Sequence, residues 1–297
     1  MDDVARFNKD RWEELARKGV MYSRPKLHFD ERLARRTVDP EGKMDDPAGR
    51  DVLCLAGGGG QQSAAFALLG ANVTVLDLCD VQLERDREAA EHYGLEVRTV
   101  QGDMRDLSCF GPDSFDLIHH AHSLNFVPQA DRVFDEVVRV LRAGGQYRMS
   151  CWNPLAHGAC ETIWHEGGYL LRGPYEEGRE VHYADPFWEL DAPTGSTFVD
   201  PGDPPCGERQ KIRVLGPREF RHTLETVVNG LIERGLSLLG LWEQDEGDPS
   251  AEPGTWDHFK SYALPWLTVW ARLTGRPGTS ARGPYRRVGA SPLRRSS

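Results

Sequence analysis

Hydrophobic and polar positions follow two different periods along this chain. Short, nearly continuous apolar runs predict buried strands at residues 51–56, 73–78, 95–101, 115–121 and 146–152. Between these runs, apolar residues recur at helical spacing and predict amphipathic helices over 61–69, 81–93 and 130–141. Strands that alternate with helices indicate a parallel sheet covered on both faces and joined by right-handed crossovers. The pattern therefore predicts a doubly wound α/β fold.

Glycines indicate where the core helices should end. Gly70 and Gly94 follow the first two helices, and the pair Gly144-Gly145 follows the third. Glycine adopts the left-handed backbone that commonly terminates a helix. The fifth strand is therefore expected to begin only after this pair.

Regular structure is also predicted on both sides of the core. Helices are expected at 8–19 and 217–235, strands at 236–244 and 264–273, and a loop at 246–257. Pro217 lies in the first turn of the later helix, where proline is tolerated.

Residues 153–215 do not follow this rhythm and are rich in glycine, proline, acids and aromatic residues. So long an irregular segment is functional or disordered, and its large aromatic side chains argue against disorder. We interpret it as a cap over the ligand site. Its part 156–215 holds 11 acidic and five basic residues, which would suit a cationic ligand. A solvated acidic loop explains the same charges.

The charge balance narrows the range of partners. The 297 residues include 46 acidic and 36 basic side chains, for a net charge of −10. A general nucleic-acid binder needs a basic face, so this balance argues against one. Residues 276–297 hold six Arg and no acid, and we interpret them as a disordered basic tail. Binding of RNA or of an acidic partner by this tail is an open alternative.

Nothing in the sequence indicates export or membrane insertion. The six cysteines form no C-x-x-C pair, and the N-terminus is acidic and polar. No apolar run approaches the ~18 residues that a membrane span needs. We therefore expect a cytoplasmic protein with reduced thiols and no membrane partner.

The strongest local motif is the glycine-rich run LAGGGGQ (55–61) between the first strand and the first helix. Such a run brings backbone close to a ligand and directs a helix N-terminus toward it. Asp77 ends the second strand, 17 residues beyond Gly60, where an acid can accept hydrogen bonds from ribose hydroxyls. Together these features predict a ligand that contains adenosine.

Two such ligands compete, a dinucleotide and S-adenosylmethionine (SAM). A dinucleotide loop prefers G-x-G-x-x-G, and Ser63 occupies the third glycine position here. SAM has no phosphate and needs ribose acceptors, an adenine slot and partners for its methionine end. After the third strand, Asp103 can accept the adenine amino group and Met104 can pack against the ring. The alternative for Asp103 is a loop acid that caps the next turn.

These motifs resemble the class I SAM-dependent methyltransferases, in particular the type 11 group that acts on small molecules. The resemblance rests on VLCLAGGGGQ, VTVLDL, QGDM, FDLIHHAHSLNFVP and VFDEVVRVLRAGG, and extends more loosely through 217–273. It implies a Rossmann-like sheet of seven strands, mostly parallel with the last antiparallel, and a cap inserted between strands 5 and 6. The expected regions are a helical segment over the SAM site (1–49), the SAM-binding core (50–152), the substrate cap (153–215), the C-terminal part of the sheet (216–275) and the basic tail (276–297).

The resemblance also implies which residues bind the cofactor. They are the loop residues Ala56, Gly57, Gly58, Gly60 and Gln61, the ribose acid Asp77 with Leu78 and Gln82, the adenine-side pair Asp103 and Met104, the carbonyl of His120 at the methionine amine, and Tyr22 over the adenosine. Core packing is the alternative for Tyr22. The chain departs from the family at Cys54, where an acid is usual, and at Ala56, where the first glycine is usual. The methionine ammonium is then left to the carbonyls of Ala56 or His120.

Three histidines follow the fourth strand, at the edge where the methyl group of SAM should point. Strand alternation would place His120 and His122 on one face and His119 on the other. Methyl transfer is an in-line displacement that depends first on alignment, and a base is needed only for acceptors that lose a proton early. His122 is the first candidate for base or orienting group, followed by His120, and structural packing is the alternative. The H-H-x-H run has no carboxylate or Cys partner at metal spacing, so no metal is expected.

Other side chains near this edge are candidates for the acceptor site. Asn125 is expected either to bind the substrate or to cap its loop. Tyr183, Trp188 and Trp152 are expected to contact the substrate through their aromatic rings.

We therefore expect an enzyme that transfers a methyl group from SAM to O or N of a small molecule. Three rivals stay open: a SAM enzyme with non-methyl chemistry such as intramolecular cyclisation, an RNA or protein methyltransferase that uses the basic tail, and a non-catalytic SAM-binding regulator. A monomer and a homodimer are both compatible with the sequence.

Overall fold

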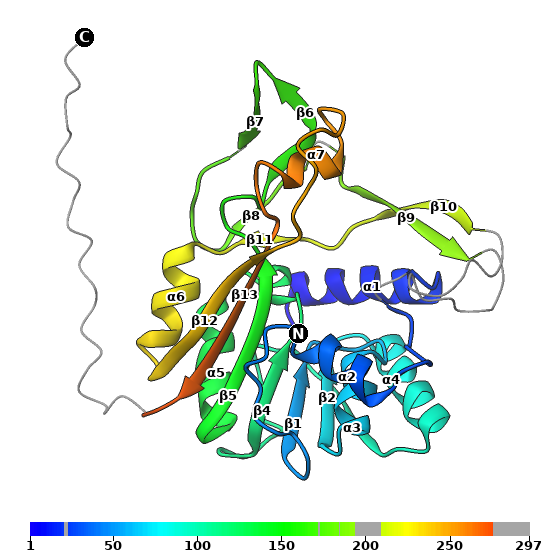
Figure 1. Cartoon of the computed structure of the whole chain (residues 1–297), viewed down its shortest axis with the longest axis vertical. Helices are drawn as coiled ribbons and strands as arrows, with labels where there is room; N and C mark the ends of the chain where they lie inside the picture. The colour runs from blue at the N-terminus through cyan, green and yellow to red at the C-terminus, as the bar shows by residue number, and fades with distance from the viewer. Residues whose placement is uncertain (21–22, 172, 184, 194–208, 276–297) are drawn as a thin grey trace.

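A computed structural model shows a seven-stranded sheet at the centre of the molecule (Figure 1). The structure describes residues 1–20, 23–171, 173–183, 185–193 and 209–275. The sheet strands are β1 (Asp51–Leu55), β2 (Asn72–Asp77), β3 (Val97–Gln101), β4 (Phe115–His120), β5 (Leu141–Trp152), β12 (Leu236–Gln244) and β13 (Trp266–Leu273). Their order is β12-β13-β5-β4-β1-β2-β3, and the last strand, β13, runs antiparallel to both neighbours. This topology confirms the predicted fold.

Alternate residues of β1 enter two hydrophobic clusters on opposite faces of the sheet. Leu53 and Leu55 belong to the cluster with α5 (Ala130–Val140) and α6 (Leu224–Ile232). Val52 and Cys54 belong to the cluster with the helices α2 (Glu31–Val38), α3 (Gln62–Leu68) and α4 (Asp80–Tyr93). Neighbouring side chains of a strand point to opposite faces. A continuous apolar run is therefore what a doubly covered sheet requires.

Helix α1 (Asp3–Arg17) begins earlier than the predicted helix 8–19. The Asp2 side chain accepts a hydrogen bond from Ala5 N at 2.9 Å and so caps the first turn. Figure 1 shows α1 lying across the upper ends of the central strands, between the sheet and the insertion above it. Helix α2, which was not predicted, lies in the connection that follows.

The stretch 153–215 was predicted to be irregular, but its described residues contain five strands. It contains β6 (Ala159–His165), β7 (Gly168–Leu171), β8 (Arg179–Glu180), β9 (Phe187–Pro193) and β10 (Arg209–Leu215). β6 pairs with β7 and β9 with β10, both antiparallel. The first hairpin turns at Glu166 (φ +47°) and Gly167 (φ +89°), two left-handed residues typical of a tight hairpin. The segment is inserted between β5 and β12, and Figure 1 shows it above the sheet.

The predicted boundary between α5 and β5 is wrong. The helix ends at Val140 and the strand begins directly at Leu141, so Gly144 and Gly145 lie within β5. Leu141 pairs with Phe115 of β4 ahead of a register shift, and this long-range pairing extends the strand across the glycines.

The predicted helix 217–235 is shorter in the structure. Phe220–Arg221 form β11, which pairs with β8 of the insertion. Helix α6 begins only after Thr223, whose Oγ1 accepts a hydrogen bond from Thr226 N at 3.2 Å. The preceding Pro217 therefore does not lie in the first turn of a helix.

The remaining C-terminal elements largely match the prediction. β12 and β13 cover the two expected strands, and the loop predicted at 246–257 leads into a short helix, α7 (Trp256–Lys260). Among the described residues, no helix combines the length and the apolar character needed to cross a membrane. The basic tail 276–297 lies outside the described residues.

Candidate active site

The glycine-rich loop connects β1 to α3 and packs tightly against β2 and α4. A Cβ on Gly58 would lie 2.7 Å from Cβ of Gln82 and 3.0 Å from the Asp77 carboxyl carbon. Gly60 has φ +72°, and a Cβ there would lie 2.5 Å from the carbonyl oxygen of Arg85. Side chains are therefore excluded at both positions, whereas Ala56 tolerates its Cβ with φ +45°.

Asp77 lies at the end of β2 beside this loop, as predicted. Its Oδ2 accepts a hydrogen bond from Gly58 N at 3.0 Å, and its Oδ1 accepts one from Cys79 N at 2.8 Å. Burial raises the pKa of this carboxyl. Each carboxylate oxygen has two lone pairs, so both retain capacity for further donors.

Gln82 lies beside the same loop on the first turns of α4. Its Oε1 is buried and has no hydrogen-bond partner among the described residues. A buried amide oxygen normally has a donor. The loop, Asp77 and Gln82 thus provide acceptors and a closely approached backbone, which fit an adenosine ligand better than they fit a pyrophosphate.

Asp86 is a loop contact that sequence reasoning missed. This fully buried residue on α4 accepts hydrogen bonds from Gly59 N at 3.0 Å, Gly60 N at 3.1 Å and Ser63 Oγ at 2.5 Å. Burial raises its pKa to about 7, and the nearby charge of Asp77 adds to the rise. The sequence feature that could have indicated a buried Asp86 is its helical spacing from Leu83 and Ala89, with which it shares the buried face of α4.

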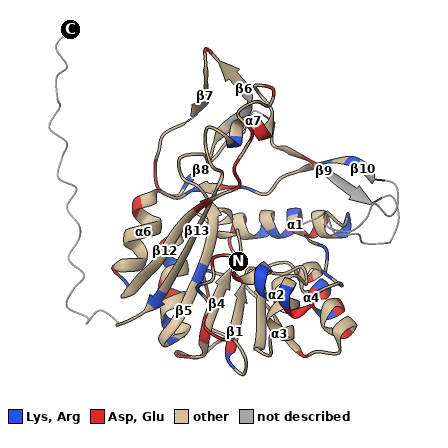
Figure 2. Ribbon diagram, viewed as in Figure 1, with Lys and Arg blue, Asp and Glu red and all other residues tan. Residues whose placement is uncertain are grey.

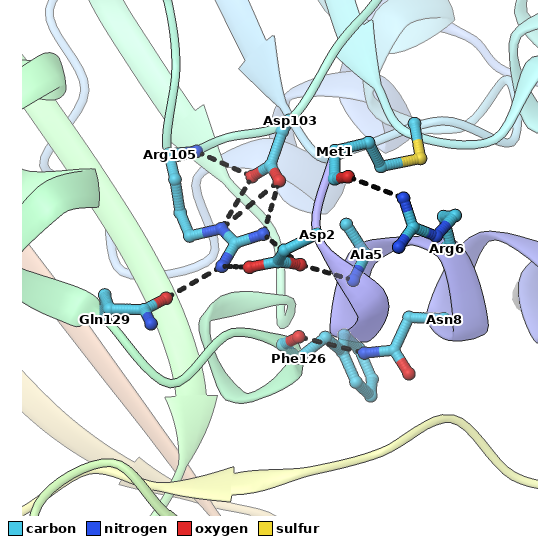
Figure 3. A network of polar contacts seen from close by, with 9 residues as sticks. All are labelled: Met1, Asp2, Ala5, Arg6, Asn8, Asp103, Arg105, Phe126 and Gln129. Carbon is cyan, nitrogen blue, oxygen red and sulfur yellow. Dashed lines mark hydrogen bonds and ion pairs between the residues drawn. The ribbon is translucent and has the colours of Figure 1, made fainter.

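The carboxylate of Asp103 is bound by Arg105 (Figure 3). Arg105 donates from its backbone N at 2.9 Å and its Nε at 3.0 Å to Oδ1, and from a terminal nitrogen at 2.6 Å to Oδ2. The backbone contact is the turn-capping arrangement that was the alternative for Asp103. Its neighbour Met104 is buried in the hydrophobic cluster of α5. An adenine amino group would thus have to share Asp103 with this guanidinium.

Arg105 also ties α1 to the edge of the sheet (Figure 3). Its terminal nitrogens donate to Asp2 at 2.8 and 3.0 Å and to Gln129 Oε1 at 2.8 Å. All five N–H bonds of the guanidinium therefore have acceptors. Further along α1, the amide of Asn8 binds the carbonyl oxygens of Phe126 (2.9 Å) and Arg218 (3.1 Å).

The segment that follows α1 lies against the glycine loop. Lys26 N donates to Gly60 O at 3.2 Å, and Gln61 Nε2 donates to Arg24 O at 3.0 Å. The side chain of Gln61, predicted to bind the cofactor, therefore has a protein partner. Tyr22, predicted to cover the adenosine, lies outside the described residues.

The three histidines at the end of β4 have separate surroundings. His119 is buried against Phe66, with ring centroids 5.4 Å apart, on the face opposite His120 as predicted. His120 Nδ1 lies 2.8 Å from Tyr147 Oη, and its Nε2 has no hydrogen-bond partner among the described residues. His122 lies beyond the strand with φ +27°, so strand alternation does not set the direction of its side chain.

Burial controls the protonation of these three rings. It lowers the pKa of His119 well below the usual value and lowers the pKa of both His120 and His122 to about 3. At neutral pH the rings are unprotonated, yet a pKa this low makes them weak bases. The ring centroid of His122 lies 4.2 Å from that of Trp266, a contact of the kind expected for structural packing, which was the alternative for this residue.

Asn125 belongs to a buried chain of polar contacts. Its Oδ1 accepts from Trp152 N at 2.9 Å, and its Nδ2 lies 3.4 Å from Nδ1 of His157. His157 Nε2 lies 3.1 Å from Oε2 of Glu219, which also accepts from Tyr183 Oη at 3.2 Å. Both amide atoms of Asn125 are thus used inside the protein, which favours a loop-fixing role over substrate binding.

The three predicted substrate aromatics do not form one cluster. The Trp152 ring stacks on His157 (centroids 5.2 Å apart), which links it to Tyr183 through Glu219. Trp188 instead packs against Trp12 of α1, with centroids 6.0 Å apart.

Several of the 11 acidic residues of the insertion lie against basic partners. Ion pairs join Glu176 to Arg179, Glu177 to His222, Glu180 to Arg218 and Asp185 to Arg213. Figure 2 shows acidic and basic residues interspersed over the helices and the insertion in this view. This pairing weakens the argument for a cationic ligand. In the described part of the chain, no group of three or more His, Cys, Asp or Glu is arranged to hold a metal ion.

Comparisons with known proteins agree with this fold. Residues 53–149 match the family described as a methyltransferase domain. The uncharacterized methyltransferase YbaJ of Bacillus subtilis is 33% identical over 237 residues, which is 80% of this chain and 85% of that protein. A demethylmenaquinone methyltransferase of Clavibacter sepedonicus is 39% identical over 101 residues, 33% of this chain and 40% of that enzyme.

Solved structures share the fold at low sequence identity. A SAM-dependent methyltransferase from Mesorhizobium loti is 21% identical with a TM-score of 0.55, covering 83% of this chain and 100% of that chain. One from Clostridium acetobutylicum is 16% identical with a TM-score of 0.53, covering 83% and 93%. The fold and the loop with its carboxylates define a class I methyltransferase. This chain belongs to the class I SAM-dependent methyltransferases.

Proposed function

We propose that this enzyme transfers the methyl group of SAM to O or N of a small molecule. One observation supports the proposed position of the cofactor. The glycine-loop amides and the Asp77 carboxylate meet at the carboxyl ends of β1 and β2. In open α/β sheets, ligands bind in the crevice outside the carboxyl ends of the strands.

Different residues around this point would bind different parts of the cofactor. Asp77 would accept the ribose hydroxyls, and the buried Oε1 of Gln82 would take a further donor of the ligand. The remaining cofactor residues would be Ala56, Gly57, Gly58, Gly60 and Gln61 in the loop, Leu78, Asp103 and Met104 around adenine, His120 at the methionine end, and Tyr22. The region 1–49, which contains α1, would cover this site.

The transfer itself needs alignment more than proton chemistry. The acceptor atom forms a bond to the methyl carbon while the carbon–sulfur bond breaks, and the electron pair stays on sulfur, so that S-adenosylhomocysteine leaves. Positioning alone can supply ~7–11 kcal/mol of such a barrier. The weakly basic His120 and His122 would orient the acceptor, which favours a nucleophile that needs no early deprotonation.

A small-molecule acceptor is supported by the insertion that covers this end of the sheet. Residues 153–215 would form the substrate cap, with Trp152, Tyr183 and Trp188 as contact residues. The relatives named for demethylmenaquinone and sterol 24-C methylation match only about a third of this chain. They support a small-molecule acceptor without defining it.

One alternative has its own motivation. Cys54 and Ala56 depart from the family at the methionine end, and Ala56 has a left-handed backbone there. A changed methionine pocket would favour intramolecular attack within the aminobutyryl chain of SAM. This reaction releases methylthioadenosine instead of S-adenosylhomocysteine.

Calorimetric titration with SAM and S-adenosylhomocysteine, followed by mass spectrometry of products from a metabolite extract, tests the proposal. We expect binding of both compounds and release of S-adenosylhomocysteine with a methylated metabolite. Methylthioadenosine as the product would replace methyl transfer by the alternative. Failure of both compounds to bind at millimolar concentration would refute the proposal.

A further inference from the structure

One buried carboxylate next to the cofactor loop has no role in the function proposed so far. Asp86 has no exposed surface, and its two oxygens accept hydrogen bonds from Gly59 N, Gly60 N and Ser63 Oγ. These three partners are neutral donors. A carboxylate buried among neutral groups costs free energy, so its contacts must stabilise something that the fold needs.

The glycine loop is the segment that gains from these contacts. Gly59 has φ +122° and Gly60 has φ +72°, and glycines lose more conformational freedom on ordering than any other residue. Asp77 of β2 binds the amide of Gly58, and Asp86 of α4 binds the next two amides. Three successive amides are therefore anchored by two carboxylates from outside the loop.

Ser63 extends the same anchor into the helix that follows. Its hydroxyl is buried and donates to Oδ1 of Asp86, the oxygen that also binds Gly60 N. Ser63 lies in the first turn of α3. The Asp86 carboxylate thus links the loop to the start of α3, across the point where the backbone turns toward the ligand.

We propose that Asp86 is a positioning residue for SAM, which sets the path of the glycine loop from Gly59 to Ser63. The inference rests on the proposed function, because the loop path matters to the reaction only if the loop holds SAM. Asp86 acts through the loop and need not touch the cofactor.

The charge of Asp86 also acts on Cys54 of β1. Burial raises the pKa of the Cys54 thiol well above its usual value, and the charge of Asp86 raises it further. Cys54 stands where the resemblance leads one to expect an acid. In this chain β1 supplies no acid at that position, and the carboxylates that bind the loop come from β2 and α4.

Three variants of the full chain separate positioning from simple stabilisation. Asp86→Asn keeps the shape and one acceptor oxygen, Asp86→Ala removes both, and Ser63→Ala removes one of the three donors. Glu84→Gln is the matched control, since Glu84 is an exposed acid on the same helix. Each protein is melted under circular dichroism, and its folded form is titrated with S-adenosylhomocysteine by calorimetry.

We expect affinity to fall in the order wild type, Asp86→Asn, Asp86→Ala. The loss should be about tenfold for Asp86→Asn, because at least one loop amide then lacks an acceptor. Ser63→Ala should lose less, about two- to fivefold, and Glu84→Gln should bind as the wild type does. A role in stability alone would lower the melting temperature and leave the affinity of the folded protein unchanged.

The two hypotheses fail in different ways. If the wild type does not bind S-adenosylhomocysteine, the proposed function is wrong. If the wild type binds and folded Asp86→Asn binds equally well, the proposed function stands and the positioning role is overturned. If the Asp86 variants do not fold, Ser63→Ala decides, and unchanged affinity in that variant overturns the inference.

Discussion

The substitution Asp2→Asn tests whether Arg105 holds α1 over the proposed cofactor site (Figure 3). Arg105 is 6% exposed and binds Asp2 through both terminal nitrogens, and Asp103 on its other side. Asn caps a helix about as well as Asp. The substitution therefore removes the charge of the Asp2 side chain and keeps the cap on Ala5 N.

The size of the effect follows from the pKa of Asp2. The hydrogen bond from Arg105 lowers this pKa from 3.8 to about 2. At about 1.4 kcal/mol per pKa unit, this corresponds to about 2.5 kcal/mol. Asp2 is 50% exposed, so solvent screening reduces the figure to about 1 kcal/mol, or about a fivefold change in the opening of α1. This stabilisation is present above pH ~4 and is lost as the pH falls toward 2.

Two measurements read this opening directly. Hydrogen exchange of amides in the first turns of α1 should accelerate about fivefold, and S-adenosylhomocysteine should dissociate faster by a similar factor. Asp3→Asn is the matched control, because Asp3 is the exposed neighbour that pairs with Arg6 instead. Equal exchange and dissociation rates in Asp2→Asn and the wild type would refute the reasoning that Arg105 latches α1.

Other predictions concern the loop, the buried carboxylate and the tail. Gly58→Ala places a Cβ 2.7 Å from Cβ of Gln82, so it should lower the free energy of unfolding by about 1–3 kcal/mol and abolish S-adenosylhomocysteine binding. Gly111→Ala is the control, because the nearest atom to its Cβ would lie at 3.7 Å, and it should change neither quantity. Because the pKa of Asp86 is raised to about 7, its contribution to stability is fully present below pH ~4 and declines as the pH rises to 7, by on the order of 4 kcal/mol. Urea denaturation from pH 5 to 8 should show about 2.5 kcal/mol of this decline, and Asp86→Asn should lack it. An unchanged slope in the variant would contradict the assignment. Deletion of 276–297 should leave turnover of a small-molecule acceptor unchanged, and loss of activity would favour the rival that uses the basic tail.

The sequence by itself determined the sheet core and part of the site. In β1, alternate residues such as Leu53 and Cys54 serve opposite faces, and the flanking helices carry apolar stripes of helical period. These signals are local, because side-chain direction repeats every two residues in a strand and every 3.6 in a helix. The glycine loop and Asp77 were predictable for the same reason, since both come directly after strands whose carboxyl ends meet.

Only the tertiary structure decided the contacts that join distant segments. Asp2 meets Arg105 across 103 positions, and Asp86 reaches the loop from 26 and 27 positions away. β5 runs through Gly144 and Gly145 because β4 pairs with it, and the short strands of the insertion have partners that local pattern does not identify. Such contacts depend on which surfaces packing brings together, and a single buried acid or a two-residue strand leaves no periodic trace in the sequence. The residues that hold the loop and α1 in place were therefore visible only in the folded chain.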